Sequence, residues 1–420
     1  MAAESGLETA PDCNAAGQET ALLESLADRC VKCGLCLPHC PTYGLSRNEG
    51  DSPRGRISLI QGLTAGKLEP SARLQHHLDT CLGCRACETV CPANVEFGRI
   101  MDSGRQSLRN RAPGYRPSAL ATLFARPGGM RAARWLLAVA RAARLPALAR
   151  RLPGTMGRLA GLLGPESRSF RNRGSEAAGS VAGDHVLLFT GCVQSVVDGR
   201  TLEDTVAVLS AAGYRVRAPE GQVCCGALPG HAGDLAGARR MAERNIETFG
   251  SGTAPVVCLA TGCTATLLEA RDPAGKQEFA QRVTAVETLL LARLDRLDLK
   301  PVTGEALVHQ PCTQRNVTGG FPNTLRLLQA IPELQVSPLA GNDRCCGAAG
   351  DHLLRHPDQA SALAAPKTLA IRHSAARFVV TSNIGCALHL GRATGHTPPI
   401  LHPVSLIARS LRGDSGSTRE

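Results

Sequence analysis

Two short stretches of the 420-residue chain each place four cysteines at the same spacing. They read "CVKCGLCLPHCP" from residue 30 and "CLGCRACETVCP" from residue 81, with gaps of two, two and three residues between the cysteines. This is the bacterial ferredoxin pattern, in which three thiolates on a tight loop bind one [4Fe-4S] cluster and the fourth reaches across to the other. The pattern predicts two [4Fe-4S] clusters, one held by Cys30, Cys33, Cys36 and Cys91, the other by Cys81, Cys84, Cys87 and Cys40.

Zinc is the alternative occupant of such cysteine runs. Four-cysteine zinc sites are usually built from two separated pairs, with about 12 or more residues between them. Here each set of four lies within eleven residues, which favours the clusters.

The chain contains eighteen cysteines in all, and its first residues, "MAAESGLETAPDC", lack the basic start and apolar stretch of a signal peptide. We therefore expect a reducing, cytoplasmic location, where dense cysteine indicates metal ligation or thiol chemistry. No apolar run approaches the roughly 18 residues that a membrane span requires.

The positive charge of the chain is concentrated in one segment. The net charge is +11, yet residues 105–173 contain fifteen arginines, no lysine and one acid, Glu166. The rest of the chain is slightly acidic, so the overall basicity does not predict nucleic-acid binding. An aromatic content of 3% also argues against a base-stacking surface.

Within this segment, "MRAARWLLAVARAAR" has the periodicity of an amphipathic helix. A helical wheel gathers Trp135, Leu136, Val139, Ala142 and Ala143 on one side, and Arg134, Arg141 and Arg144 opposite, with Arg131 at the border. Such a helix suits an anionic membrane surface or an acidic partner. A basic helix packed on its own protein is the alternative.

From about residue 181 the sequence becomes α/β. Runs such as "HVLLFTGC", "APVVCLATGC", "EALVHQPC" and "RFVVTSNIGC" read as buried strands that each lead to a cysteine. We predict an α+β multidomain protein whose parts are a leader and first helix (1–28), a two-cluster ferredoxin-type domain (29–108), a basic helical connector (109–180) and two α/β modules (181–300 and 301–420).

The two C-terminal modules are copies of one pattern. Their cysteines match at offsets of 120 to 123 residues, and "QVCCGALPGHAGD" recurs as "DRCCGAAGDH". Four thiols in each module suffice for a metal or a cluster, and a structural or docking role is the alternative that we favour. The two sets are Cys192, Cys224, Cys225 and Cys263 in module 1, and Cys312, Cys345, Cys346 and Cys386 in module 2.

Other polar residues receive more ordinary interpretations. Ser52 and Pro53 predict the start of a helix. Arg54 and Arg56 follow, and we interpret them as surface charges, with stabilisation of reduced clusters as the alternative. Cys258 is expected to be plain core. Four histidines near the module cysteines are expected to be hydrogen-bonded scaffold, with ligation or proton transfer as the alternative: His231, His309, His352 and His402.

The order of motifs resembles the iron-sulfur subunit of bacterial glycolate oxidase, with two cysteine-rich CCG domains. "CVKCGLCLPHCPTY", "DSPRGRISLI", "HLDTCLGCRACETVCPANV", the two CCG modules and "SNIGCALHL" carry the resemblance over nearly the whole chain. It implies an electron-transfer subunit without catalytic residues of its own. On this resemblance, flavin (FAD) on partner subunits is expected to oxidise a 2-hydroxy acid, and this chain to pass the electrons toward a quinone-type acceptor.

The same layout is found in iron-sulfur subunits of lactate-utilisation, anaerobic glycerol-3-phosphate dehydrogenase and heterodisulfide reductase systems. A lactate or glycerol-3-phosphate dehydrogenase subunit, a thiol/disulfide enzyme and a non-catalytic iron-sulfur scaffold are therefore the alternatives. Each module departs from the fullest CCG pattern, because Ala260 and Asn383 stand where a further cysteine would complete Cys-x2-Cys. That departure weighs against the disulfide reductase. The chain has no G-x-G-x-x-G motif after a strand, which places the flavin on a partner.

Overall fold

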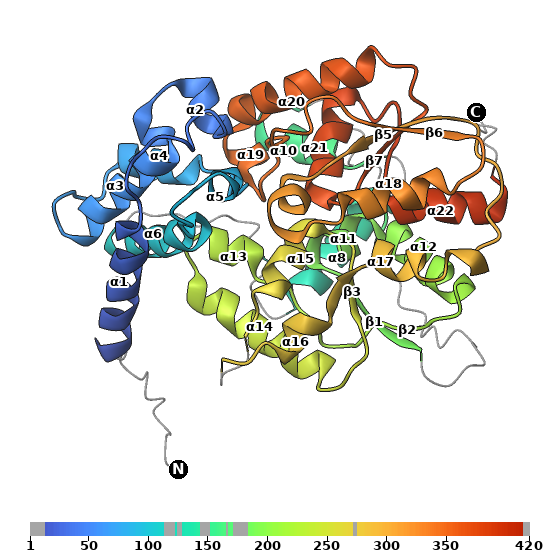
Figure 1. Ribbon diagram of the computed structural model, residues 1–420, viewed down its shortest axis with the longest axis horizontal. Coiled ribbons are helices and arrows are strands. Elements are labelled where there is room, and N and C mark those ends of the chain that lie inside the picture. The colour runs from blue at the N-terminus through green and yellow to red at the C-terminus, as the bar shows by residue number, and fades with distance from the viewer. Residues whose placement is uncertain are drawn as a thin grey trace. The chain divides into compact units, whose positions relative to one another are not determined.

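The computed structural model describes residues 13–112, 122–123, 128–142, 152–164, 167–170, 184–271 and 275–414 (Figure 1). The backbone divides into two compact units, Met1–Cys81 with Cys87–Tyr115, and Leu82–Ala86 with Arg116–Glu420. The short segment Leu82–Ala86 of the second cysteine run therefore belongs to the same unit as the C-terminal half.

The first unit is helical. Its described elements are α1 (Cys13–Asp28), α2 (Pro41–Ser46), η1 (Glu49–Asp51), α3 (Pro53–Thr64), α4 (Ala72–Asp79), α5 (Ala86–Thr89), whose first residue lies in the second unit, and α6 (Phe97–Arg111). Helices α1, α3 and α4 pack on α6 around a core that includes Leu26, Ile60 and Ile100. Gly104 permits this close packing, because a Cβ there would lie 2.4 Å from Ile60.

Helix α3 begins as the sequence predicts. The Ser52 side chain accepts a hydrogen bond from the Gly55 N–H at 2.9 Å, and Pro53 occupies the first helical position. An N-cap of this kind satisfies an amide that the helix itself leaves without a partner.

The interpretation of Arg56 as a surface charge is wrong. Its side chain is 1% exposed and donates to His77 O at 2.7 Å, Asp51 O at 2.5 Å, Thr42 Oγ1 at 3.0 Å and Thr80 Oγ1 at 3.2 Å. A guanidinium has five N–H donors, and burial is tolerated because carbonyl and hydroxyl oxygens from several segments accept them. Arg56 thus ties α2, η1 and α4 to α3.

The second unit contains two parallel four-stranded sheets with the same topology. Sheet 1 has the order β2-β1-β3-β4, from β1 (His185–Phe189), β2 (Arg215–Arg217), β3 (Val256–Cys258) and β4 (Val283–Ala285). Sheet 2 has the order β6-β5-β7-β8, from β5 (Gly304–His309), β6 (Leu334–Pro338), β7 (Phe378–Thr381) and β8 (Ile400–Leu401). The predicted fold class and the internal duplication are confirmed.

Helical crossovers join the strands, as parallel pairing requires. Sheet 1 is accompanied by α11 (Cys192–Val197), α12 (Gly199–Ala211), α13 (Ala227–His231), α14 (Leu235–Phe249), α15 (Thr261–Leu268), α16 (Glu278–Arg282), α17 (Val286–Leu291) and η2 (Leu294–Arg296). Sheet 2 is accompanied by η3 (Gln314–Thr318), α18 (Phe321–Gln329), α19 (His352–Arg355), α20 (Pro357–Arg372), α21 (Ile384–Thr394) and α22 (Pro403–Arg412).

The two modules share one hydrophobic core. Helix α12 of module 1 packs against α22 of module 2, and residues of both, including Leu202 and Ile407, are fully buried in the same cluster. Polar contacts cross the same boundary, from Thr201 Oγ1 to Ser405 Oγ at 3.2 Å and from Arg412 Nη1 to Asp204 Oδ1 at 2.9 Å. The modules are therefore two halves of one packed body.

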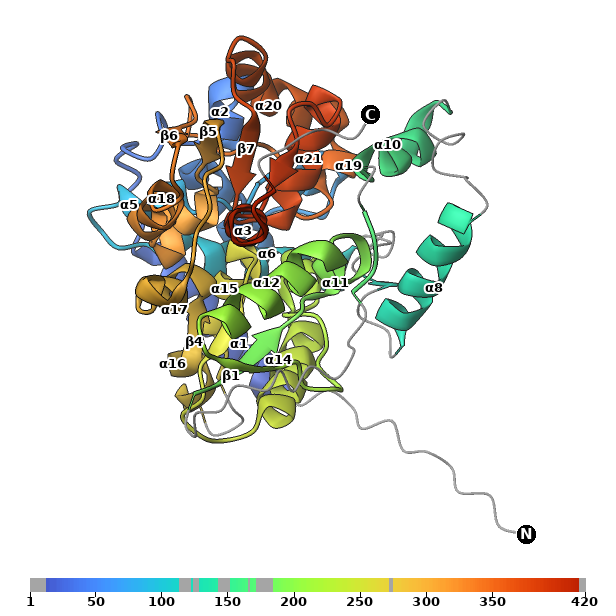
Figure 2. The same cartoon turned by 90° about the vertical axis from the view of Figure 1, so that its right-hand side faces the viewer.

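The predicted amphipathic helix is present as α8 (Gly129–Ala142), and a second connector helix, α10 (Gly154–Leu162), follows it. Helix α8 packs beside α11 through Ala133 and Leu137, and α10 lies against α21 (Figure 2). Trp135 is 65% exposed on α8, so the apolar side recognised in the sequence faces away from the module. Ala143 and Arg144 lie outside the described residues.

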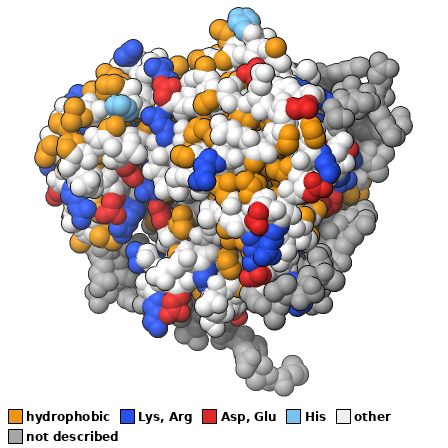
Figure 3. All heavy atoms as spheres, turned by 45° about the vertical axis from the view of Figure 1, so that its right-hand side comes forward, with side chains coloured by type: hydrophobic (Ala, Val, Ile, Leu, Met, Phe, Trp, Pro, Cys, Tyr) orange, Lys and Arg blue, Asp and Glu red, His pale blue; other side chains and the backbone are white. Residues whose placement is uncertain are grey.

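No helix in the described ranges is both long and apolar enough to cross a lipid bilayer. On the face drawn in Figure 3, side chains of both charges are interspersed with apolar ones and do not gather into a patch of one sign.

Candidate metal centres

The two cysteine runs form loops with the same backbone twist. In the first loop the residues two and four positions after the leading cysteine, Lys32 and Gly34, have φ angles of 56° and 88°. In the second loop the equivalent residues, Gly83 and Arg85, both have φ of 58°. Left-handed backbone at these positions winds each loop tightly, and Lys32 and Arg85 adopt it although they carry a Cβ.

The cysteine side chains of these runs suit iron-sulfur ligation. Every cysteine whose side chain the structure describes is a free thiol. In the first unit, Cys87 is buried in the hydrophobic core, and Cys30, Cys36, Cys81 and Cys91 pack against that core. Thiols backed by apolar side chains are a fitting donor set for [4Fe-4S] clusters, whose potentials depend on solvent exposure and on hydrogen bonds to sulfur.

Hydrogen bonds made by buried arginine and threonine side chains fix the structure around two of these cysteines, Cys40 and Cys81. Cys40 Sγ lies 3.3 Å from Thr42 Oγ1, and that hydroxyl also accepts a hydrogen bond from Arg56. Arg105, 4% exposed, donates to Cys81 O at 2.8 Å. Arg56 and Arg105 are positioning residues that the sequence interpretation missed, and their acceptors are mostly main-chain carbonyls.

Arg54 contacts the first loop from outside. Its Nη1 donates to Lys32 O at 3.1 Å, while its Nε pairs with Glu49 Oε1 at 2.7 Å. Burial raises the pKa of the Cys36 thiol, and a hydrogen bond from the Arg54 backbone N–H partly opposes this rise. The same amide would stabilise a Cys36 thiolate.

In module 1 the predicted cysteines come together as a row of buried thiols. Cys192 Sγ lies 3.4 Å from Cys224 Sγ, and further thiol contacts join Cys224 to Cys225 and Cys225 to Cys263. The hydrogen bond with Cys224 and then burial raise the pKa of Cys192 well above its usual value. The row continues to Cys258, whose thiol interacts with that of Cys263 and donates to Ala260 O at 3.6 Å. Cys258 is buried, as expected, but its thiol belongs to the row.

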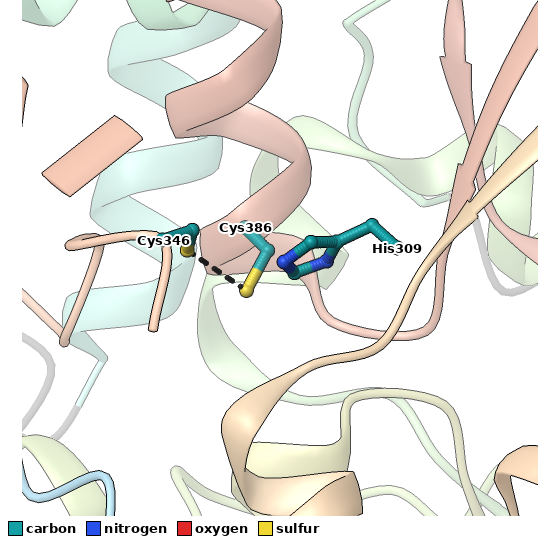
Figure 4. Close-up of side chains that lie close together, drawn as sticks. All are labelled: His309, Cys346 and Cys386. Atoms are coloured by element: carbon teal, nitrogen blue, oxygen red, sulfur yellow. Dashed lines mark hydrogen bonds between the residues drawn. The ribbon is translucent and has the colours of Figure 1, made fainter. Parts of the chain in front are cut away.

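In module 2 the equivalent cysteines form a second row. Cys346 Sγ lies 3.2 Å from Cys386 Sγ, and thiol contacts join Cys312 to Cys345 and Cys345 to Cys346. The sulfur atoms of Cys346 and Cys386 and a ring nitrogen of His309 all lie within 4.8 Å of one another (Figure 4). Module 2 thus adds an imidazole to its thiols.

The segment Leu82–Ala86 of the second cysteine loop lies next to this row. Leu82 and Cys84, which belong to the same unit as module 2, pack with Cys312 and Cys345. Asn316 Nδ2 donates to Cys84 O at 2.7 Å, which fixes the loop backbone. A predicted cluster ligand and a module cysteine are therefore neighbours in the folded chain.

The remaining histidines differ in their surroundings. His352 Nε2 contacts Gln359 Oε1 at 2.7 Å and its Nδ1 contacts Gly347 O at 3.2 Å, and His402 Nε2 contacts Leu259 O at 3.1 Å. These two are hydrogen-bonded scaffold, as expected. His231 lies at the end of α13, and its role stays a prediction.

Comparison with known families agrees with this arrangement. Residues 26–95 match the 4Fe-4S dicluster domain, and residues 186–268 and 306–391 each match the cysteine-rich domain. The two cysteine-rich matches coincide with the modules around sheets 1 and 2, and the dicluster match contains both cysteine runs.

Two curated relatives align over most of the chain. The probable glycolate oxidase iron-sulfur subunit of Bacillus subtilis (strain 168) is 31% identical over 391 residues, 86% of this chain and 87% of the relative. The glycolate oxidase iron-sulfur subunit of Escherichia coli (strain K12) is 29% identical over 412 residues, 92% and 95% of the two chains. Lactate utilization protein A of Shouchella clausii is 28% identical over 217 residues, 49% of this chain and 90% of the relative. By its cluster-binding motifs, its duplicated modules and this full-length similarity, the chain belongs to the family of glycolate oxidase iron-sulfur subunits.

Proposed function

We propose that this chain carries electrons from a flavin-containing partner subunit, which oxidises glycolate, to a quinone-type acceptor. The observation that supports it most is the combination of two ferredoxin runs with relatives named for glycolate oxidase that cover at least 86% of the chain. Relatives named for lactate utilization cover about half of it, so we propose glycolate as the substrate ahead of lactate or glycerol 3-phosphate.

We propose the ligand sets read from the sequence, namely Cys30, Cys33, Cys36 and Cys91 for one cluster and Cys81, Cys84, Cys87 and Cys40 for the other. When bound, each [4Fe-4S] cluster supplies a one-electron redox centre. The chain positions the thiolates with left-handed loop residues, shields them with the helical core, and provides N–H donors such as that of Arg54 to sulfur. Substrate oxidation itself would occur on the partner's cofactor.

The metal content tests the ligand assignment. Anaerobically purified protein should contain about eight iron and about eight labile sulfide per chain. Zinc at the ferredoxin runs in place of sulfide-bearing clusters would contradict the proposal.

The Cys84→Ser variant tests the direction of electron flow in the assembled complex. Substrate-dependent flavin reduction should survive, while electron transfer to a quinone analogue should stop, because only the route through this chain is damaged. Cys258→Ser, a buried cysteine outside both ferredoxin runs, is the matched control and should transfer electrons normally. Parent-rate transfer by Cys84→Ser, measured by rapid-mixing spectroscopy, would end the electron-carrier proposal.

We further propose that α8 attaches the chain to the anionic inner face of the cytoplasmic membrane. Trp135, Leu136 and Val139 are exposed on a helix that also carries several arginines, which suits insertion at a charged lipid surface. Changing Arg131, Arg134, Arg141 and Arg144 to Gln should weaken binding to anionic vesicles, and added salt should weaken binding of the parent. If this variant binds vesicles as the parent does but binds the flavin partner more weakly, α8 is a contact between subunits and not a membrane attachment.

A further inference from the structure

His309 is a buried histidine whose Nε2 is available to bind a metal ion. It is the last residue of β5 and is 1% exposed. Its Nδ1 contacts Thr381 Oγ1 on the neighbouring strand β7 at 3.0 Å, and in the tautomer in which Nδ1–H donates to that hydroxyl, Nε2 carries a free lone pair. Among the described residues Nε2 has no hydrogen-bond partner. A buried imidazole nitrogen of this kind needs a partner that the protein does not otherwise supply.

Two thiols lie where that partner would be. Cys346 follows β6 in the loop to α19, and Cys386 lies in the first turn of α21, so three segments distant in sequence converge. Figure 4 shows the His309 ring directed toward Cys386, with Cys346 beyond it. The ligand atoms are within 4.8 Å of one another, and the two sulfurs are 3.2 Å apart. In a tetrahedral Cys–Cys–His site the sulfur atoms are separated by about 3.8 Å, so small side-chain shifts suffice.

The surroundings also fit a bound cation. Cys345 and Cys312 lie outside the group of ligand atoms within 4.8 Å of one another, but both thiols interact electrostatically with Cys346, so a side-chain rotation of either would bring a fourth donor. The ammonium of Lys367, buried at 1% exposure and hydrogen-bonded to Gly341 O, lies within electrostatic reach of Cys346 and Cys386. That positive charge offsets part of the negative charge that several thiolates would bring to one ion.

Module 1 provides an internal comparison. The strand register pairs Phe189 with Cys258 in sheet 1 and His309 with Thr381 in sheet 2. At the position of the imidazole module 1 therefore has a phenyl ring, which cannot bind a metal. The duplicated modules have diverged at the two residues that would orient and complete the site.

We propose that module 2 binds one thiophilic divalent metal ion, Zn²⁺ or Fe²⁺, through His309 Nε2, Cys346 Sγ and Cys386 Sγ, with Cys345 or Cys312 as the fourth ligand. Imidazole and thiolate donors suit both ions. The thiols lose their protons on binding, so uptake of the ion releases protons to solvent. The ion would join β5, the β6–α19 loop and α21. This proposal does not depend on the partner, substrate or acceptor proposed above.

The full chain, purified anaerobically, tests it by comparing metals with labile sulfide. The [4Fe-4S] clusters contain equal numbers of iron and sulfide. We therefore expect the sum of iron and zinc to exceed sulfide by about one per chain, after incubation with Zn²⁺ or Fe²⁺ and removal of loose metal. If the metal in excess over sulfide is zinc, the bound ion is Zn²⁺. If it is iron, the bound ion is Fe²⁺. Equal metal and sulfide in the parent after both incubations would overturn the proposal, and extra iron with matching extra sulfide would show a cluster in its place.

His309→Phe introduces the side chain that module 1 already accommodates at the same place, so the fold should survive. The excess metal should be lost, while the sulfide content stays at the parent level. His352→Gln is the matched control, because His352 is a buried module 2 histidine whose ring nitrogens both have partners; it should keep the excess. An excess that persists in His309→Phe would remove His309 from the site.

Thiol alkylation gives a second readout that does not depend on metal surviving purification. Adding Zn²⁺ to the parent should protect Cys346 and Cys386 from an alkylating reagent, as measured by mass spectrometry of the two peptides. The Zn²⁺ concentration needed for protection should rise more than about tenfold in His309→Phe, and about 10–100-fold in Thr381→Val, which removes only the group that orients the ring. Equal protection in parent and His309→Phe would refute the assignment.

Discussion

Replacing Arg56 with methionine removes the guanidinium that ties four segments of the first unit together. Methionine keeps an unbranched apolar side chain but supplies no donor to Asp51 O, His77 O and the Thr42 and Thr80 hydroxyls, which Arg56 contacts at 2.5–3.2 Å. Asp51 keeps its 2.8 Å contact with His77 Nδ1 but loses the nearby guanidinium at 3.8 Å.

The expected cost is large because these groups are buried. Removing one partner of a buried ion pair destabilises by about 3–5 kcal/mol, and hydrogen bonds to a charged group contribute about 1.5–3 kcal/mol each without being additive. We therefore expect local opening of the first unit to become about 3–5 kcal/mol easier, a factor of roughly 10² to 10⁴ in the opening constant.

Hydrogen exchange of the anaerobic, cluster-containing protein measures this opening at the amides of α3 and α4. Arg54→Met is the matched control, two residues away on the same helix. Its ion pair with Glu49 is solvent-exposed, at 32% and 49% for the two side chains, and such exposed pairs contribute little to stability. Protection in Arg56→Met within about tenfold of that in Arg54→Met would show that the buried network does not stabilise the unit as reasoned here.

Three further predictions concern the second unit. Burial lowers the pKa of His402 to about 4. Stability is therefore full above about pH 6.5 and is lost as the pH falls toward 4, because in this range the unfolded state takes up a proton that the folded state does not. His402→Asn keeps an N-cap side chain, and it should reduce the loss of hydrogen-exchange protection in α22 between pH 7 and pH 5 by about 2 kcal/mol. Gly347→Ala, whose Cβ would lie 2.8 Å from a backbone oxygen at φ +87°, should lower the thermal unfolding temperature more than Gly395→Ala, which has φ +70° and open space. Trp135→Ala should weaken binding to anionic vesicles about tenfold or more in a flotation assay, and equal binding would exclude insertion of α8.

Much of the fold could be predicted from the sequence because its signals are local. Apolar runs of strand length, such as those that end at Phe189 and His309, give β1 and β5, and fully buried parallel strands need no polar alternation. Repetition of the cysteine spacing revealed the duplication, and the two sheets have the same strand order. The Ser52-Pro53 helix start was equally local and is confirmed.

The roles of Arg56, Cys258 and His309 could not be predicted in the same way, because they depend on contacts between segments that are far apart in the sequence. Arg56 resembles any helical arginine in sequence, because its acceptors are mostly carbonyls and hydroxyls from residues 42–80. Cys258 looks apolar until α15 brings Cys263 against it. The position of His309 beside two thiols follows from pairing of β5 with β7, although aligning the modules, which places His309 on Phe189, was an available signal.

The shared core of α12 and α22 has a consequence for how the chain is made. Module 1 leaves the ribosome first, with the face of α12 that includes Leu202 and Leu209 uncovered until α22 is synthesised about two hundred residues later. At 5–20 residues per second this takes roughly 10–40 s. During that time the nascent chain presents an apolar surface to its surroundings, so a fragment that stops near residue 300 should aggregate or be captured by chaperones. Release of the completed polypeptide, including α22, is then the step that allows module 1 to bury this surface.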